Sequence, residues 1–216
     1  VLIGTPTVFI RLYGCNLRCD WCDSMYAVEG NEYNVRTIGS VMKEAEIYSC
    51  DNICITGGEP LLQIEQVVSI TERFIDLKKN IILETAGHIE PPNIFNSKNT
   101  VISMDCKCPS SKMNSTINLE NLLKLKSKDQ IKFIIGTDDD YSFAKELIKK
   151  NPSSDYVISL ILDREEMKSK KKLDLLQEKE SVDSYFSFFD IISEFKDDDL
   201  DYLKFLIGSE KSEKFY

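Results

Sequence analysis

Short apolar stretches alternate with longer amphipathic stretches from the start of the chain to about Asp163. Six apolar stretches have the length and composition of β-strands: VFIRLY, NICIT, IILET, TVISMD, QIKFIIG and DYVISLIL. Between them apolar residues recur at helical spacing, and we predict helices over 37–49, 61–79, 119–126 and 141–150. This alternation of strand and helix predicts an α/β protein with a parallel sheet.

The arrangement of the sheet stays open at this level. Six parallel strands with helices outside them form either a partial (β/α) barrel or an open doubly wound sheet, and periodicity does not choose between the two. The strands read as nearly continuous apolar runs, which is typical of strands covered on both faces. We therefore expect both faces of this sheet to be buried.

The chain changes character after about Asp163. A charged stretch, REEMKSKKKLDLLQEKESVD, is followed by SYFSFFDIISEF and a final segment that carries much of the acidic excess. A length of 216 residues favours one domain around one core. We therefore predict a core domain over 1–163 and a helical C-terminal extension of the same domain over 164–216.

Composition and charge exclude several classes of protein. A hydrophobic share of 42% is that of a globular protein, and the formal net charge of −9 argues against sequence-independent binding to nucleic acid. No run approaches the roughly 18 apolar residues of a membrane span, and the first residues lack the pattern of a signal peptide. We expect a cytoplasmic protein with no membrane partner, in which seven clustered cysteines serve metal or redox chemistry rather than disulfides.

Three of the cysteines, Cys15, Cys19 and Cys22, follow the first predicted strand at C-x3-C-x2-C spacing. Such a loop can point three thiolates at one site, and zinc, an iron–sulfur cluster or unrelated buried cysteines are the alternatives. A [4Fe-4S] cluster normally takes four thiolates, so three would leave one iron open for another ligand. A structural zinc ion is almost always bound by four protein ligands, and here the fourth would come from a distant residue: Cys50, Cys54, Cys106, Cys108 or His88.

This loop resembles the radical S-adenosylmethionine (SAM) superfamily, whose hallmark is C-x3-C-x2-C with an aromatic residue before the last cysteine. Here that residue is Trp21, the only tryptophan, for which ordinary loop packing is the alternative. The resemblance implies that Cys15, Cys19 and Cys22 hold a [4Fe-4S] cluster. It also implies that SAM binds the open iron, with Trp21 beside its adenine.

The segment ITGGEP follows the second predicted strand and resembles the GGEP motif of the same superfamily. Two glycines allow a close backbone approach to a ligand, and the proline ends the strand. An ordinary strand-to-helix turn would show the same residues. The resemblance implies that Gly58 contacts the amine of SAM, while Glu59 is expected to support the loop.

Polar residues also end the third and fourth predicted strands, in ETAG and in MDCKCPSS. Ligands bind at the carboxyl edge of a parallel sheet, so Glu84, Asp105 and Lys107 are expected at the same mouth as the cysteines. Solvated strand ends are the alternative. Cys106 and Cys108 flank Lys107, where packing is a more frequent role than a second metal site.

Taken together, TPTVFIRLYGCNLRCDWCDS, TGGEPLLQ, ETAG, DCKCPSS and KFIIGTDDDYSFAKELI resemble the 7-carboxy-7-deazaguanine synthases, particularly the archaeal form. The resemblance implies a radical SAM lyase with a trimmed barrel, working as a homodimer with a flavodoxin- or ferredoxin-type electron donor. The implied reaction converts 6-carboxy-5,6,7,8-tetrahydropterin to 7-carboxy-7-deazaguanine and ammonia, toward queuosine or archaeosine in transfer RNA.

The resemblance also implies roles for single residues. Arg11 and Thr56 would bind the pterin substrate, where a guanidinium can hold a carboxylate with two hydrogen bonds. Ser24 stands where the family usually has a threonine that ligates Mg²⁺, a cation that prefers oxygen ligands. The implied SAM contacts are Trp21, Asp23, Gly58, Glu84, Asp105, Cys106 and Lys107.

The sequence departs from the family at three places. A Q-G-E-G segment that contacts the pterin would precede Val1, so we expect either a truncated chain or an enzyme without that contact. The tail has none of the histidine usual near the family's C-terminus, and ETAG replaces the commoner ETNG. Two rivals follow: a glycyl-radical activating enzyme, and a zinc-stabilised or inactive binding module.

Overall fold

A six-stranded parallel sheet organises the computed structural model, which describes residues 4–150 and 155–160. Its strands are arranged in the order β1-β2-β3-β4-β5-β6, the same as their order along the chain. The six predicted strands are therefore confirmed. Their bounds are Thr7–Leu12 (β1), Asn52–Gly57 (β2), Asn80–Thr85 (β3), Thr100–Cys106 (β4), Gln130–Ile135 (β5) and Asp155–Leu160 (β6).

Helices connect most of the strands, as the periodicity predicts. The four-residue helix α1 is the one α-helix of the described residues that periodicity misses, since one turn is too short to show a period. The α-helices are Met25–Val28 (α1), Ile38–Ile47 (α2), Ile64–Asp76 (α3), Leu119–Leu123 (α4) and Asp138–Lys150 (α5). The 3₁₀ turns are Pro60–Gln63 (η1), Asn93–Asn96 (η2), Pro109–Ser111 (η3) and Asn114–Thr116 (η4).

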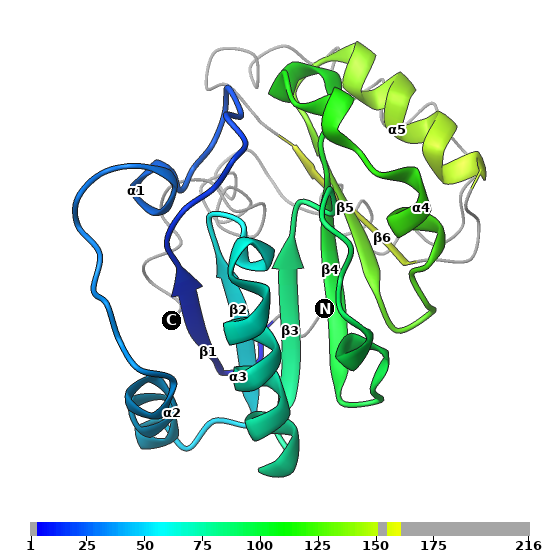
Figure 1. Ribbon diagram of the computed structural model, residues 1–216. Coiled ribbons are helices and arrows are strands. Elements are labelled where there is room, and N and C mark those ends of the chain that lie inside the picture. Colours follow the sequence, from blue (N-terminus) through cyan, green and yellow to red (C-terminus); the bar gives the residue numbers. More distant parts are fainter. Residues whose placement is uncertain (1–3, 151–154, 161–216) are drawn as a thin grey trace, which may run out of the picture.

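The strand order decides between the two arrangements that periodicity left open and confirms the partial barrel that the family resemblance implies. A doubly wound sheet reverses its strand order at a switch point, which places helices on both faces. Here the order never reverses, and the helices lie to one side of the sheet (Figure 1). The fold is a partial barrel, and the connection from β3 to β4 contains only the 3₁₀ turn η2, as expected for a trimmed form.

One face of the sheet forms the hydrophobic core. Side chains from α2, α3, α4 and α5 pack against it, including Met42, Val67, Phe74 and Ala144. Alternate residues along a strand point to the same face, and the strand residues of this cluster in β2 to β5 are accordingly two positions apart. The strand residues are Ile10, Ile53, Ile55, Ile81, Leu83, Ile102, Met104, Cys106, Ile131, Phe133 and Ile135.

The opposite face of the sheet carries polar side chains, near the carboxyl ends of β1 to β4 and at the start of β5. In β5, for example, Gln130 and Lys132 alternate with the core residues Ile131 and Phe133. The expected burial of both faces agrees with the low exposure of Thr56, Ser103 and Gln130 in β2, β4 and β5, but the side chains on this face are polar rather than apolar. The polar residues stand inside the stretches that the sequence analysis treated as continuous apolar runs. The alternation of polar and apolar residues within those stretches was therefore missed.

The described residues include no helix long and apolar enough to cross a membrane. The predicted helical tail over 164–216 lies outside the described residues, so the division at 163 stays a prediction.

The close approach of β2 to β1 at their carboxyl ends requires glycine. Gly57 has φ +145°, and a Cβ built on it would lie 2.0 Å from the carbonyl oxygen of Leu12. The positive φ angle is strained for any residue with a side chain. The added Cβ would also meet backbone atoms of Leu12, which cannot move aside as a flexible side chain could. This contact sets the position of the loop that follows β1.

We expect Gly57→Ala to lower the free energy of unfolding by about 3 kcal/mol or more, through backbone strain and overpacking. The melting temperature, followed by circular dichroism, should fall by roughly 6 °C or more. Gly39→Ala is the matched control, because nothing lies within 4 Å of its added Cβ in α2. That variant should be as stable as the parent or slightly more stable, and an equal loss in both variants would contradict the steric argument.

Candidate active site

The loop that carries the three cysteines leaves β1 at Leu12 and is fastened at its start. The N–H of Gly14 donates to Ala27 O at 2.7 Å, and Gly14 O accepts from the N–H of Glu59 at 2.9 Å. Gly58 N–H donates to Leu12 O at 3.0 Å. The cysteine loop, α1 and the GGEP turn are thus joined through backbone hydrogen bonds.

The three thiols share one loop and one electrostatic environment. Cys15, Cys19 and Cys22 are partly exposed, and a turn joins Cys22 N–H to Cys19 O at 3.2 Å. Burial raises the pKa of Cys15 and of Cys19, and the nearby cation of Lys107 opposes this. The N–H of Leu17 also donates to Cys15 Sγ at 3.4 Å, the kind of contact that stabilises a cluster thiolate.

The donor set fits an iron–sulfur cluster better than a single zinc ion. A tetrahedral zinc ion draws its sulfurs to within about 2.3 Å of one point. Within residues 4–150 and 155–160, no three His, Cys, Asp or Glu side chains are placed to hold one metal ion. A cluster spreads its thiolate ligands over several irons, so three electrostatically coupled thiols on one loop suit it.

Trp21 and Lys107 lie against one another beside the cysteines. Lys107 Nζ is 5.3 Å from the centre of the Trp21 ring, a cation–π distance. The indole N–H donates to Ser110 Oγ at 3.1 Å. Residues from the loops after β1 and β4 therefore meet, as predicted from the carboxyl edge of a parallel sheet.

Asp105 and two lysines form the charged part of this edge. Asp105 Oδ2 lies 2.8 Å from Lys107 Nζ and 3.9 Å from Lys132 Nζ. Burial alone would raise the pKa of Asp105, but the two cations hold it below its usual value. Its other oxygen, Oδ1, is buried without a hydrogen-bond partner, so it can accept a hydrogen bond from a bound ligand.

Cys106 and Gly58, two of the predicted SAM contacts, offer no side chain to a ligand. The Cys106 side chain lies in the hydrophobic core, and burial raises its pKa to about 12. Cys108 is fully buried as well, with its thiol 3.7 Å from Cys106 O. A Cβ on Gly58 would lie 2.3 Å from Gly14 O, so this glycine serves close packing inside the protein, whatever its carbonyl contacts.

Glu59 is buried between the turns after β2 and β3, with 1% of the residue exposed. Its carboxylate accepts hydrogen bonds from the N–H of Leu61 and of Ala86, both at 2.9 Å, and from the Thr85 hydroxyl. His88 Nδ1 lies 3.9 Å from it, and His88 Nε2 lies 2.9 Å from Asn16 Oδ1. The predicted role of Glu59 as a loop support agrees with these contacts.

A row of polar side chains crosses the face of the sheet away from the core. Arg11 is in register with Thr56, whose hydroxyl donates to Glu84 Oε2 at 2.8 Å. Glu84 is in register with Ser103, which accepts from Gln130 Nε2 at 2.7 Å. The sequence analysis predicted Arg11, Thr56 and Glu84 as site residues and missed Ser103, Gln130 and the nearby Lys132. The alternation of polar and apolar residues in their strands could have indicated them.

Arg11, Ser24 and Asp23 complete the set of predicted residues. The Arg11 guanidinium lies 5.7 Å from the centre of the Tyr26 ring, which follows the cysteine loop. The hydroxyl of Ser24 donates to Asp23 Oδ1 at 2.7 Å. Two oxygen-bearing side chains are thus adjacent on the loop, and their chemistry suits a hard cation such as Mg²⁺.

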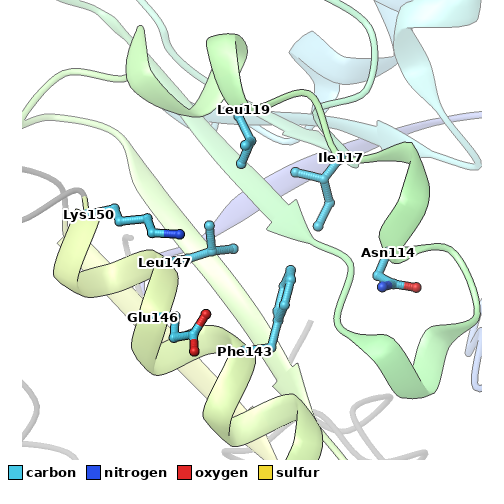
Figure 2. Close-up of a pocket in the computed structure, with 7 residues that line it drawn as sticks. All are labelled: Asn114, Ile117, Leu119, Phe143, Glu146, Leu147 and Lys150. Carbon is cyan, nitrogen blue, oxygen red and sulfur yellow. The ribbon is translucent and has the colours of Figure 1, made fainter.

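A separate pocket of about 250 Å³ lies between α5 and the segment before α4 (Figure 2). None of the predicted site residues lines it. Its lining residues are Asn114, Ile117, Leu119, Phe143, Glu146, Leu147 and Lys150. We therefore place the candidate active site at the cysteine loop and the polar row, not in this pocket.

Comparison with known proteins identifies the class and then the family. The family model of the radical SAM superfamily matches residues 9–162. The 7-carboxy-7-deazaguanine synthase of Methanospirillum hungatei is 41% identical over 151 residues, which span 69% of this chain and 62% of that protein. The synthase of Koribacter versatilis is 36% identical over 165 residues, covering 73% of this chain and 69% of the relative.

The synthase of Thermoplasma acidophilum is 34% identical over 148 residues, covering 68% of this chain and 69% of that relative. The chain thus spans about three fifths of the Methanospirillum relative and somewhat more of the other two. Its fold and cysteine loop define the class, that of the radical SAM proteins. Within that superfamily, the chain belongs to the family of the 7-carboxy-7-deazaguanine synthases.

Solved structures share the fold. The crystal structure of QueE from Escherichia coli matches with a TM-score of 0.59 at 21% identity, over 81% of this chain and 83% of that one. Streptococcus suis SuiB bound to S-adenosylmethionine matches with a TM-score of 0.55 at 14% identity, over 73% of this chain and 40% of SuiB. At these identities the likeness concerns the fold alone.

We expect Glu59→Gln to lower the free energy of unfolding by about 1–3 kcal/mol, because an amide NH₂ would face the N–H of Ala86 or the N–H of Leu61. The urea midpoint measures this loss. Glu65→Gln is the control, since Glu65 is exposed in the first turn of α3, and its effect should stay within about 0.5 kcal/mol. A similar small effect for Glu59→Gln would show that the carboxylate does not support the loops.

Proposed function

We propose that this chain catalyses the formation of 7-carboxy-7-deazaguanine from 6-carboxy-5,6,7,8-tetrahydropterin with release of ammonia. One observation carries the proposal: the three-cysteine loop follows the strand that bears Arg11, and Arg11 is in register with Thr56, whose hydroxyl donates to Glu84. A metal-binding loop above a polar sheet face is the arrangement that a radical lyase acting on a small polar substrate needs. The relatives named 7-carboxy-7-deazaguanine synthase support the same assignment.

Cys15, Cys19 and Cys22 would hold a [4Fe-4S] cluster, and SAM would bind at its open iron. When bound, this pair supplies a radical that removes a hydrogen atom from the substrate. The chain's own part is to bind and orient: Trp21 offers a ring for the adenine, and Asp105 Oδ1 offers an unused acceptor. The Lys107 cation balances the negative charge of the thiolates, to which it is electrostatically coupled.

The polar row would position the pterin. Arg11 can hold the substrate carboxylate with two hydrogen bonds. The hydrogen-bonded pair of Thr56 and Glu84 presents a hydroxyl and a carboxylate to the nitrogen-rich ring. Because these side chains stand on strands rather than on loops, their separation is set by the sheet and changes little when substrate arrives.

Ser24 would bind Mg²⁺, with the adjacent Asp23 carboxylate close enough to attract the cation. Mg²⁺ usually keeps waters or substrate oxygens in its remaining positions, so the metal would join the loop to the substrate carboxylate. A homodimer and a flavodoxin- or ferredoxin-type electron donor belong to the same proposal, through the family resemblance.

The decisive experiment is turnover by the anaerobically reconstituted chain, given carboxytetrahydropterin, SAM, Mg²⁺ and a reductant. We expect the deazapurine by mass spectrometry, with one ammonia released per product and no net loss of SAM. Because substrate and products balance without an oxidant, SAM acts as a catalyst. Cleavage of SAM with a glycine-centred radical on an added protein would instead indicate an activating enzyme.

We expect Cys19→Ala to abolish the cluster absorbance near about 400 nm and with it all turnover, because one iron loses its thiolate. Cys50→Ala is the matched control, since Cys50 lies outside the loop and its thiol contacts only Pro6 O among the hydrogen bonds described. Iron and sulfide analysis of both variants measures cluster content. Binding of one zinc and no iron by the parent chain would contradict the proposal and favour a binding module.

A further inference from the structure

A chain of hydrogen bonds joins the first turn of α5 to the cysteine loop. Trp21 Nε1 donates to Ser110 Oγ at 3.1 Å, and Ser110 N–H donates to Asp140 Oδ1 at 2.7 Å. Three segments far apart in the sequence are therefore connected through one serine.

The carboxylate at the end of this chain is rigidly held. Asp140 is fully buried, and its Oδ2 accepts the N–H groups of Gly136 and Thr137, both at 2.9 Å. Burial alone would raise the pKa of Asp140, but the hydrogen bonds from Ser110, Gly136 and Thr137 lower it. The acceptor facing Ser110 is thus a fixed anion rather than a neutral acid.

The two oxygens of Asp140 have different tasks. Oδ2 completes the turn that enters α5, which is a local requirement of many helices. Oδ1 points away from its own helix to the loop after β4, where it receives Ser110. A residue needed only as a helix cap would not require this second contact.

The Trp21 ring is constrained from two directions. Lys107 lies over its face and Ser110 holds its edge. The neighbouring backbone is tied to the same loop, because Asp20 N–H donates to Ser111 O at 3.2 Å. The orientation of the ring is therefore set by the loop after β4, and that loop is set by Asp140.

We propose that Ser110 and Asp140 are positioning residues that hold Trp21 in the orientation that receives the nucleoside part of SAM. The inference rests on the proposed function for the identity of that ligand. Neither residue touches the reacting atoms, and both act through the indole. Loss of the Ser110 hydroxyl frees the indole edge, while loss of the Asp140 anion frees the loop that carries Ser110.

Fluorescence gives a direct test, because Trp21 is the only tryptophan in the chain. In the full chain before reconstitution, Ser110→Ala and Asp140→Asn should increase the acrylamide quenching constant of Trp21. Ser110→Thr should restore the parent value, since threonine keeps the hydroxyl. Asp139→Asn is the matched control, an exposed carboxylate in the same helical turn.

Ligand affinity gives the second test, by equilibrium dialysis of SAM against the reconstituted chain. Ser110→Ala should weaken SAM binding about threefold to tenfold, the effect of one lost hydrogen bond, with a smaller change in kcat. Trp21→Phe keeps a ring and lacks the N–H. In that background Ser110→Ala should therefore have no further effect.

Unchanged quenching and SAM affinity in Ser110→Ala would overturn the proposal. A full additional loss in the Trp21→Phe background would overturn it too, because Ser110 would then act by another route. If Asp140→Asn does not fold, the Ser110 variants decide. The quenching experiment needs neither cluster nor substrate, so an inactive chain would refute the proposed function and still leave this inference decided by fluorescence.

Discussion

The close contact between the carboxyl ends of β1 and β2 is the constraint on which the site depends. No side chain fits at Gly57 or Gly58, where an added Cβ would lie 2.0 Å from Leu12 O or 2.3 Å from Gly14 O. The glycine pair lets the backbone of the second strand end against the start of the cysteine loop. Three thiols can bind one metal centre only if the start of their loop has a fixed position, and this contact fixes it.

Two buried carboxylates also fix the positions of the turns at the carboxyl edge of the sheet. Glu59 fastens the turns after β2 and β3, while Asp140 fastens the loop after β4 to α5. Both carboxylates accept hydrogen bonds from several backbone N–H groups of these turns. Unpaired buried donors are costly, so these residues order loops that would otherwise have alternative conformations. The loops around the candidate site are thus joined through two anionic acceptors, Glu59 and Asp140.

Much of this arrangement could be predicted from local patterns. The six strands, the longer helices and the gathering of Cys15, Gly58 and Lys107 at one edge follow from apolar periodicity and from the direction of parallel strands. The polar character of the second face was missed, because the polar residues Gln130 and Lys132 stand inside an apolar run. Ser103 and Asp140 escaped notice, since a single serine or aspartate carries no signal until its partner is known.

The sequence by itself determined the alternation of strand and helix, the donor set on the cysteine loop and the glycines that a close turn needs, because each depends on neighbouring residues. Only the tertiary structure decided the order of the strands in the sheet, that one face is polar and that Trp21 meets Ser110, 89 positions away. Contacts between distant residues depend on the order and register of strands. A local pattern shows which face a residue takes, but not which strand lies beside it.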